Sequence, residues 1–162
     1  EDRVDYIVWV SQYGDENKTF QILSDVLQDQ TPSPTQFSTS VHNAISGLYS
    51  ILCQDATPAT SLAGSWNDAL VEAYAWLKTC ANPHAKVLVV YYEEALPVLY
   101  AEYQNFDAFS MGAIFSLDTE NLAFNMQHLE KEQFAFKQAQ AFTSFWQQQH
   151  PQSHAWQKIN VE

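Results

Sequence analysis

The residues of this chain that could act as nucleophiles are one serine at a predicted elbow and two cysteines. The elbow, Ala63-Gly64-Ser65, follows a short apolar segment and precedes a helical one. Ser65 could attack an ester only with a histidine and an acid beside it, and neither is local in the sequence. Because serine is a favoured N-cap, we predict that Ser65 caps the following helix.

The two cysteines, Cys53 and Cys80, both fall near the C-termini of predicted helices. The negative end of a helix dipole disfavours the thiolate, which is the reactive form of cysteine. Two cysteines also do not make a disulfide framework. We therefore predict that both are small packing residues.

The histidines give weaker indications. The pair His42-Asn43 has two open interpretations: pocket or interface residues, or a helix-start cap with a buried and hydrogen-bonded imidazole. His84 and His128 stand apart from other metal ligands in the sequence. Pro151 interrupts the helical spacing of His150 and His154. We therefore expect no zinc or other metal site.

Two adjacent carboxylates, Glu93 and Glu94, end a predicted strand. Neighbouring residues on a strand point to opposite faces, so we predict a solvated pair rather than paired catalytic acids. The sequence has no glycine-rich phosphate loop, and we expect no cofactor.

The charge of the chain restricts its partners. It has 162 residues with 19 acidic and 7 basic side chains, a formal net charge of -12, and 46% hydrophobic residues. Such a surface repels nucleic acid and anionic lipid, and it would also repel an acyl carrier protein unless local basic residues intervene.

No apolar run is long enough to span a membrane. We expect a cytoplasmic domain, although the chain begins at Glu1 and an upstream segment could have been removed.

The first 93 residues alternate between strands and helices. We predict strands at Asp5–Gln12, Ala59–Leu62 and Lys86–Glu93, and helices at Thr19–Asp29, from Ser33-Pro34, at His42–Leu52 and at Trp66–Cys80. The continuous apolar run of the last strand favours a parallel strand covered on both faces. This order predicts an α/β fold with a mixed, mainly parallel sheet and helices on both faces.

The remaining residues are predicted to complete the same domain. A strand lies within 106–117 and contains Gly112, which could mark a bulge. We favour a hairpin turn at 118–121 into a strand at 122–126 over one long helix. An amphipathic helix follows at 134–149, with Ala141, Phe142, Phe145 and Trp146 as its apolar stripe. We expect residues 1–131 to form the main domain, and 132–162 to pack on it as a helix and tail.

Residues 33–47 form the run Ser-Pro-Thr-x-Phe-Ser-x-Ser-Val-His-Asn-Ala-x-x-Gly, and Thr57–Leu62, the elbow and Asn67–Ala73 follow it. From about Asp5 to Leu117 this pattern resembles the chain-length-factor-like β-ketoacyl synthases of aryl polyene and related pathways. The resemblance implies a thiolase-like half fold. An earlier strand and helix of that family have no counterpart here.

The resemblance also implies where the catalytic nucleophile of a ketosynthase should lie, and at that position this chain differs from the family. A ketosynthase carries its nucleophilic cysteine at the elbow, where Ala63, Gly64 and Ser65 offer no thiol. The catalytic histidines of the family belong to a second half-fold. The resemblance makes His42, Asn43, Gly47, Thr60, Ser61 and Trp66 candidates for the pocket or the subunit interface, although Gly47 could instead allow close helix packing and Trp66 could fill the core.

Three functions follow from these observations. The first is a non-catalytic, chain-length-factor-like subunit that pairs with a catalytic ketosynthase in polyketide or fatty-acid-like biosynthesis. The second is a protein-interaction scaffold with a degenerate thiolase fold. The third is a serine-dependent acyl-thioester enzyme. In isolation, an exposed sheet edge could also allow the chain to form a homodimer.

Overall fold

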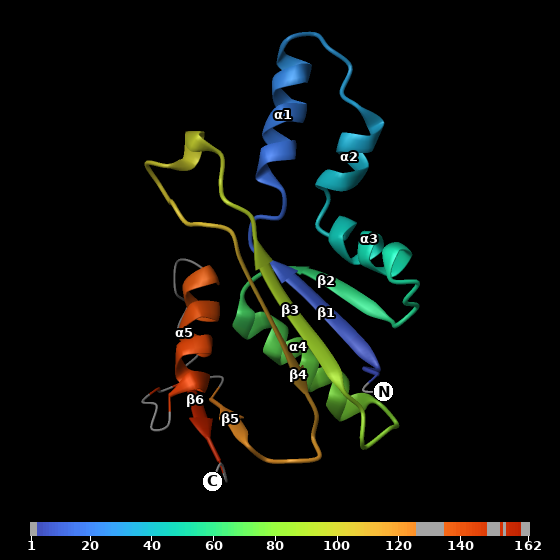
Figure 1. Ribbon diagram of the computed structural model, residues 1–162, viewed down its shortest axis with the longest axis vertical. Helices are drawn as coiled ribbons and strands as arrows, with labels where there is room; N and C mark the ends of the chain where they lie inside the picture. The colour runs from blue at the N-terminus through green and yellow to red at the C-terminus, as the bar shows by residue number, and fades with distance from the viewer. Residues whose placement is uncertain (1–2, 126–134, 149–152, 154, 160–162) are drawn as a thin grey trace.

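The computed structural model describes residues 3–125, 135–148, 153 and 155–159 of the chain. The ends of two predicted elements, at Met126 and Gln149, and three histidines, His128, His150 and His154, lie outside these residues. The described strands and helices, labelled in Figure 1, are β1 (Tyr6–Ser11), α1 (Glu16–Leu27), α2 (Pro34–Ser40), α3 (Ala44–Leu52), β2 (Ala59–Ala63), α4 (Trp66–Thr79), β3 (Val87–Glu93), η1 (Val98–Tyr100), β4 (Phe109–Phe115), β5 (Leu122–Phe124), α5 (Ala135–Gln147) and β6 (Trp156–Lys158).

The main sheet has four strands in the order β2-β1-β3-β4. Strand β1 lies at its centre and pairs in parallel with both β2 and β3, whereas β4 is antiparallel to β3. Successive parallel strands require crossover helices, and α3 and α4 supply them. The predicted α/β fold with a mixed, mainly parallel sheet is therefore confirmed.

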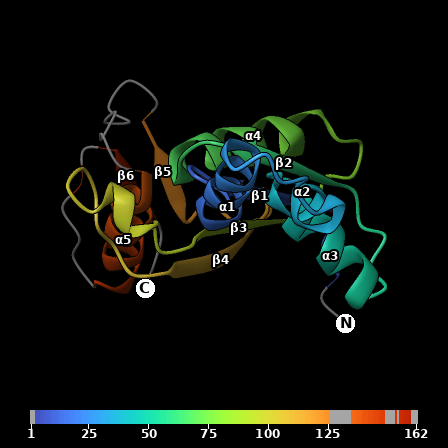
Figure 2. The ribbon, with the colours of Figure 1, turned by 90° about the horizontal axis from the view of Figure 1, so that it is seen from above.

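Helices lie on both faces of this sheet (Figure 2). On one face, Val8 and Val10 of β1 pack in a single core with Trp66 and Leu70 of α4. On the other face, Trp9 contacts Tyr49 of α3, with ring centroids 5.3 Å apart. Strand β3 alternates between buried and half-buried residues, so its coverage on both faces is less complete than its apolar run predicts.

The N-termini of the first helices show how local sequence sets their bounds. Helix α1 begins at Glu16 because the Asp15 carboxylate accepts a hydrogen bond from the Lys18 amide at 2.9 Å. The predicted cap, Thr19, instead lies in the first turn and donates to the Asp15 carbonyl. Ser33 caps α2 ahead of Pro34, as predicted. A carboxylate is the better cap for α1 because it also faces the positive end of the helix dipole.

Helix α3 differs from its prediction in which residues it buries. The sequence predicts that Leu48 and Leu52 face inward, but Leu52 is 79% exposed and Leu48 is 43% exposed. Tyr49, which is also predicted to face inward, does reach the sheet and contacts Trp9. Helix α3 has more apolar side chains than its packing against the sheet buries.

The C-terminal part of the chain contains three corrections. Gly112 forms no bulge, because β4 pairs with β3 in unbroken register. The segment after the 118–121 turn is a strand, as favoured, but β5 pairs with β6 rather than with β4. In α5 the buried residues include Phe142 and Phe145, whereas Ala141 and Trp146 of the predicted stripe are exposed. No helix in the described ranges is long and apolar enough to cross a membrane.

Candidate functional site

The carboxyl ends of β1, β2 and β3 meet at one edge of the sheet, since these three strands are parallel. Helices α1 and α2 extend beyond this edge in Figure 1. In open α/β sheets, ligands bind outside the carboxyl ends of the strands. We refer to the segments that meet here, Ser11–Gly14, Ala63–Ser65 and Glu93, as the strand-end site.

The elbow of the strand-end site is held by its backbone and by a capping box. The Gly64 amide donates to the Ser11 carbonyl at 3.0 Å, which fixes the end of β2 against β1. The Asp68 carboxylate accepts from the Ser65 amide at 2.8 Å and from Ser65 Oγ at 2.7 Å. A Cβ on Gly64 would lie 2.9 Å from Asp68 Oδ2, so a larger residue at this position would displace the Asp68 carboxylate.

Ser65 is therefore the N-cap of α4, as the sequence predicts. Its hydroxyl is engaged by Asp68, and it also accepts from the Asp68 amide at 3.3 Å. The two histidines of the described residues have other contacts: His84 pairs with Asp118, and His42 packs against Gly14. Ser65 thus has an acid beside it, but no described imidazole hydrogen-bonds to its hydroxyl as a base would.

Glu93 is the residue of the strand-end site that sequence reasoning placed wrongly. It is only 2% exposed, so it does not form a solvated pair with Glu94. Its carboxylate accepts four hydrogen bonds, from Ser11 Oγ at 3.0 Å, Tyr91 Oη at 2.9 Å, and the amides of Gln12 and Tyr13. The strand's own alternation indicated this burial, because Glu93 shares its face with Val87, Val89 and Tyr91.

Three tyrosines around Glu93 bind their protons more tightly than usual. Burial, followed by the charge of Glu93, raises the pKa of Tyr91 and Tyr13 above the ordinary value. The same two causes raise the pKa of Tyr92 to about 12. Burial and the nearby Asp15 carboxylate also raise the pKa of Glu94. The strand-end site therefore has a negative electrostatic potential. None of these three tyrosines could ionise near neutral pH.

His42 lies beside the turn that follows β1. A Cβ on Gly14 would stand 3.2 Å from the His42 ring, and Gly14 has a φ of +66°, which glycine adopts without strain. The His42 carbonyl accepts from Tyr92 Oη at 3.3 Å. His42 Nε2 is buried and has no hydrogen-bond partner in the part of the chain that the structure describes. Asn43 occupies the N-cap position of α3 but makes no side-chain capping bond.

The other predicted site residues are dispersed. Ser61 Oγ lies 3.1 Å from Ser46 Oγ and joins β2 to α3, and Thr60 directly precedes Ser61 on β2. Trp66 is fully buried and packs on Phe142, so it is a core residue. Gly47 is exposed with no atom within 4 Å of an added Cβ, and the prediction of close helix packing there is wrong.

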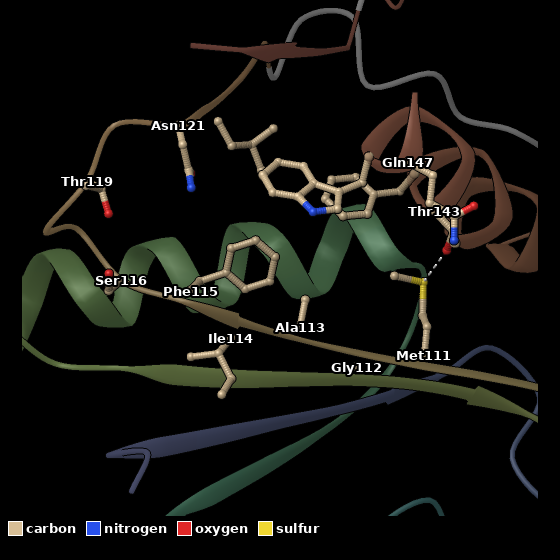
Figure 3. A pocket seen from close by; sticks show the side chains of 13 residues that line it. Met111, Gly112, Ala113, Ile114, Phe115, Ser116, Thr119, Asn121, Thr143 and Gln147 are labelled. Carbon is tan, nitrogen blue, oxygen red and sulfur yellow. Dashed lines mark hydrogen bonds between the residues drawn. The ribbon is translucent and has the colours of Figure 1, made fainter. Parts of the chain in front are cut away.

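A separate pocket of about 540 Å³ lies between β4, the 116–121 segment and α5 (Figure 3). Phe115, Met111 and Thr143 line it, and Thr143 Oγ1 donates to the Met111 sulfur. None of the described lining residues is an acid, a base or a thiol. The polar groups that line this pocket are hydroxyls, amides and a thioether, and none of the described lining side chains is ionisable.

Both cysteines lie at helix C-termini, as predicted, but only Cys80 packs against the core, and Cys53 is exposed rather than a packing residue. Cys53 follows α3 and Cys80 follows α4. The Cys80 thiol donates toward the Asn82 carbonyl at 3.2 Å. Among the described residues, no group of three or more His, Cys, Asp or Glu side chains could hold a metal ion.

Comparison with known proteins agrees with this architecture. Residues 1–161 match the family described as β-ketoacyl synthase, N-terminal domain. Among solved structures, the chain is similar to one from the ketosynthase ApeO in complex with its chain length factor ApeC from Xenorhabdus doucetiae, with a TM-score of 0.78 and 25% identity. The alignment covers 89% of this chain and 62% of that chain, so this chain spans less than two thirds of its neighbour's length. No curated protein matches the sequence.

Proposed function

Because the chain belongs to the β-ketoacyl synthase N-terminal domain family, we propose that it is a non-catalytic, chain-length-factor-like subunit that supports a partner ketosynthase. The pathway would be polyketide or fatty-acid-like biosynthesis of the aryl polyene type. In this proposal, residues 132–162 belong to the same domain as residues 1–131.

The observation that carries the proposal is the chemistry of the elbow. A ketosynthase needs a thiolate that accepts an acyl group from a thioester and later releases it by carbon–carbon bond formation. The elbow offers the methyl group of Ala63, the backbone of Gly64 and a hydroxyl on Ser65 that is already bonded to Asp68. Cys53 and Cys80 lie at the opposite, unfavourable ends of their helices.

An exposed apolar surface supports the expectation of a partner. The described helices α1 and α3 leave large apolar side chains in solvent, among them Leu27 at 85%, Leu52 at 79% and Ile51 at 72% exposure. Clusters of such residues usually mark protein interfaces. Strand β2 is also an edge strand of the sheet. We propose that His42, Asn43, Gly47, Thr60 and Ser61, which lie on or beside α3 and β2, face the partner or its pocket.

The structural neighbour supports a ketosynthase as the proposed partner. It comes from a complex of a ketosynthase with its chain length factor. A ketosynthase is therefore our proposed partner for this chain as well. The net charge of -12 disfavours direct binding of an acidic acyl carrier protein. In isolation, the edge strand β2 would allow the chain to form a homodimer.

The test is co-expression with a ketosynthase from the same host, followed by co-purification. We expect a stable complex and no covalent labelling of this chain by a malonyl or acyl thioester. Leu52→Asp should abolish co-purification, whereas the matched control Ile114→Asp should not, because Ile114 is also exposed but lies on β4 at the opposite edge of the sheet. Labelling of this chain would support the serine-dependent enzyme instead, and a complex lacking any ketosynthase would support the scaffold.

A further inference from the structure

Glu93 is a buried carboxylate whose partners, in the described part of the chain, are neutral hydrogen-bond donors. Burying an ionised carboxylate is unfavourable unless hydrogen bonds satisfy its oxygens. Here each oxygen accepts two: Oε1 from the Gln12 amide and Tyr91 Oη, and Oε2 from Ser11 Oγ and the Tyr13 amide. The hydrogen-bond acceptor positions of the carboxylate are therefore all occupied, and none is left to bind a substrate.

Three of these donors belong to consecutive residues, Ser11 at the end of β1 and Gln12 and Tyr13 in the turn that follows it. The amides of Gln12 and Tyr13 point at the carboxylate, and the Gly14 amide donates to Ser11 Oγ at 2.8 Å. Successive backbone N–H groups of this kind form an anion-binding concavity. In this protein the bound anion is the chain's own side chain, delivered by the end of β3.

The same turn contacts the elbow of the strand-end site, the His42 ring beside it and the start of α5. The Ser11 carbonyl accepts from Gly64 of the elbow. Gly14 lies against the His42 ring. The Gln12 side chain accepts from the amide of Ala135, the first residue of α5, at 2.9 Å. A shift of this turn would therefore move the elbow and the His42 ring together.

We propose that Glu93 is the positioning residue of the strand-end site. Its carboxylate holds the Ser11–Gly14 turn, and this turn fixes the positions of the His42 ring and the elbow. Glu93 acts without touching either one. Its effect on the ketosynthase complex rests on the proposed function, whereas its effect on the turn does not.

The substitution Glu93→Gln isolates this role. The amide keeps the size of the side chain but replaces one acceptor oxygen with an NH2 group. If NH2 takes the position of Oε1, the Gln12 amide loses its acceptor; if it takes the position of Oε2, the Tyr13 amide does. In both orientations a backbone N–H of the turn is left facing another donor. Glu94→Gln is the matched control, because it makes the same change one residue away at an exposed position.

The readout is nuclear magnetic resonance of the whole chain. The sequence has only four glycines, so their amide signals are easily assigned. We expect Glu93→Gln to change the chemical shifts of the Gly14 and Gly64 amides and of the His42 ring. The ring signal of His42 is identified by its loss in His42→Gln. The signal of Gly47 should stay in place, because that residue lies in open space on α3. Glu94→Gln should leave all of these signals unchanged.

A second variant keeps the test decisive if Glu93→Gln fails to fold. Ser11→Ala retains the charge and removes only the hydroxyl between Glu93 and the Gly14 amide. We expect it to move the Gly14 and His42 signals in the same direction by a smaller amount. Unchanged Gly14 and His42 signals in either variant, or equal changes at Gly47, would overturn the proposal.

The last measurement links Glu93 to the partner. We expect Glu93→Gln to weaken the complex with the ketosynthase by roughly fivefold, the lower end of typical coupling between sites. Glu94→Gln should bind as the natural chain does. If the natural chain itself binds no ketosynthase, the proposed function fails, and the glycine and histidine signals still decide the role of Glu93. Unchanged affinity with moved signals would limit Glu93 to ordering the turn and would overturn its role in assembly.

Discussion

The substitution Ser65→Ala separates a helix cap from a nucleophile at the elbow. In the structure, Ser65 Oγ donates to Asp68 Oδ2 at 2.7 Å and accepts from the Asp68 amide at 3.3 Å. Alanine removes both hydrogen bonds. The bond from the Ser65 amide to the Asp68 carboxylate, at 2.8 Å, remains available. The variant therefore loses part of the capping box and keeps part of it.

The expected magnitude follows from this partial loss. Replacing an N-cap serine with alanine typically lowers the free energy of unfolding by about 1 kcal/mol. In a domain of this size, each kcal/mol lowers Tm by about 2–4 °C. We therefore expect Ser65→Ala to lower Tm by about 2–4 °C. Ser65→Gly should lower the free energy of unfolding by only a few tenths of a kcal/mol, roughly, because glycine is tolerated at an N-cap.

The assay combines thermal unfolding followed by circular dichroism with hydrolysis of an acyl thioester. A double-mutant cycle of Ser65→Ala and Asp68→Ala should show coupling of roughly 0.5 kcal/mol or more, since the two side chains bond directly. Any background hydrolysis should be equal in the natural chain and in Ser65→Ala. The reasoning would be refuted by an unchanged Tm, or by a loss of hydrolysis larger than the change in the folded fraction explains.

Two further predictions concern α3 and the tyrosines. Gly47→Ala should raise the free energy of unfolding by roughly 0.5–1 kcal/mol, because alanine is the better helix former and the added methyl meets no atom within 4 Å; a lower urea midpoint would contradict this. Tyr92, with its pKa raised to about 12, should keep its proton in the folded state when the unfolded state loses it above about pH 10. Stability should therefore fall between about pH 10 and 12. Tyr92→Phe should make that fall less steep in urea titrations, and an unaltered slope would count against the burial of this hydroxyl.

Much of the local structure could be predicted because its causes are local. The cap at Ser65 follows from a serine ahead of an amphipathic helix with an acid three residues on. Strands β1 and β3 follow from their apolar, β-branched runs. The pairing of β5 with β6 could not be predicted in this way, because it joins segments more than 30 residues apart and depends on the packing of α5 between them.

In the candidate site, too, some features follow from the sequence and others only from the fold. The absence of a thiol at Ala63-Gly64-Ser65 is a property of the sequence, and no fold can alter it. The role of Glu93 is a property of the tertiary structure. Its burial depends on β3 lying beside β1, which brings the carboxylate to Ser11 and to the amides of the next two residues, about 80 positions earlier in the chain.

The sequence by itself determined the α/β order of elements, the family resemblance and the lack of a thiol at Ala63-Gly64-Ser65, because these depend on residue types and on spacing along the chain. Only the tertiary structure decided which polar groups are buried together. Hydrogen bonding and desolvation depend on neighbours in space. For that reason Glu93 became the centre of the strand-end site, Trp66 became core, and Gly47 was left in solvent.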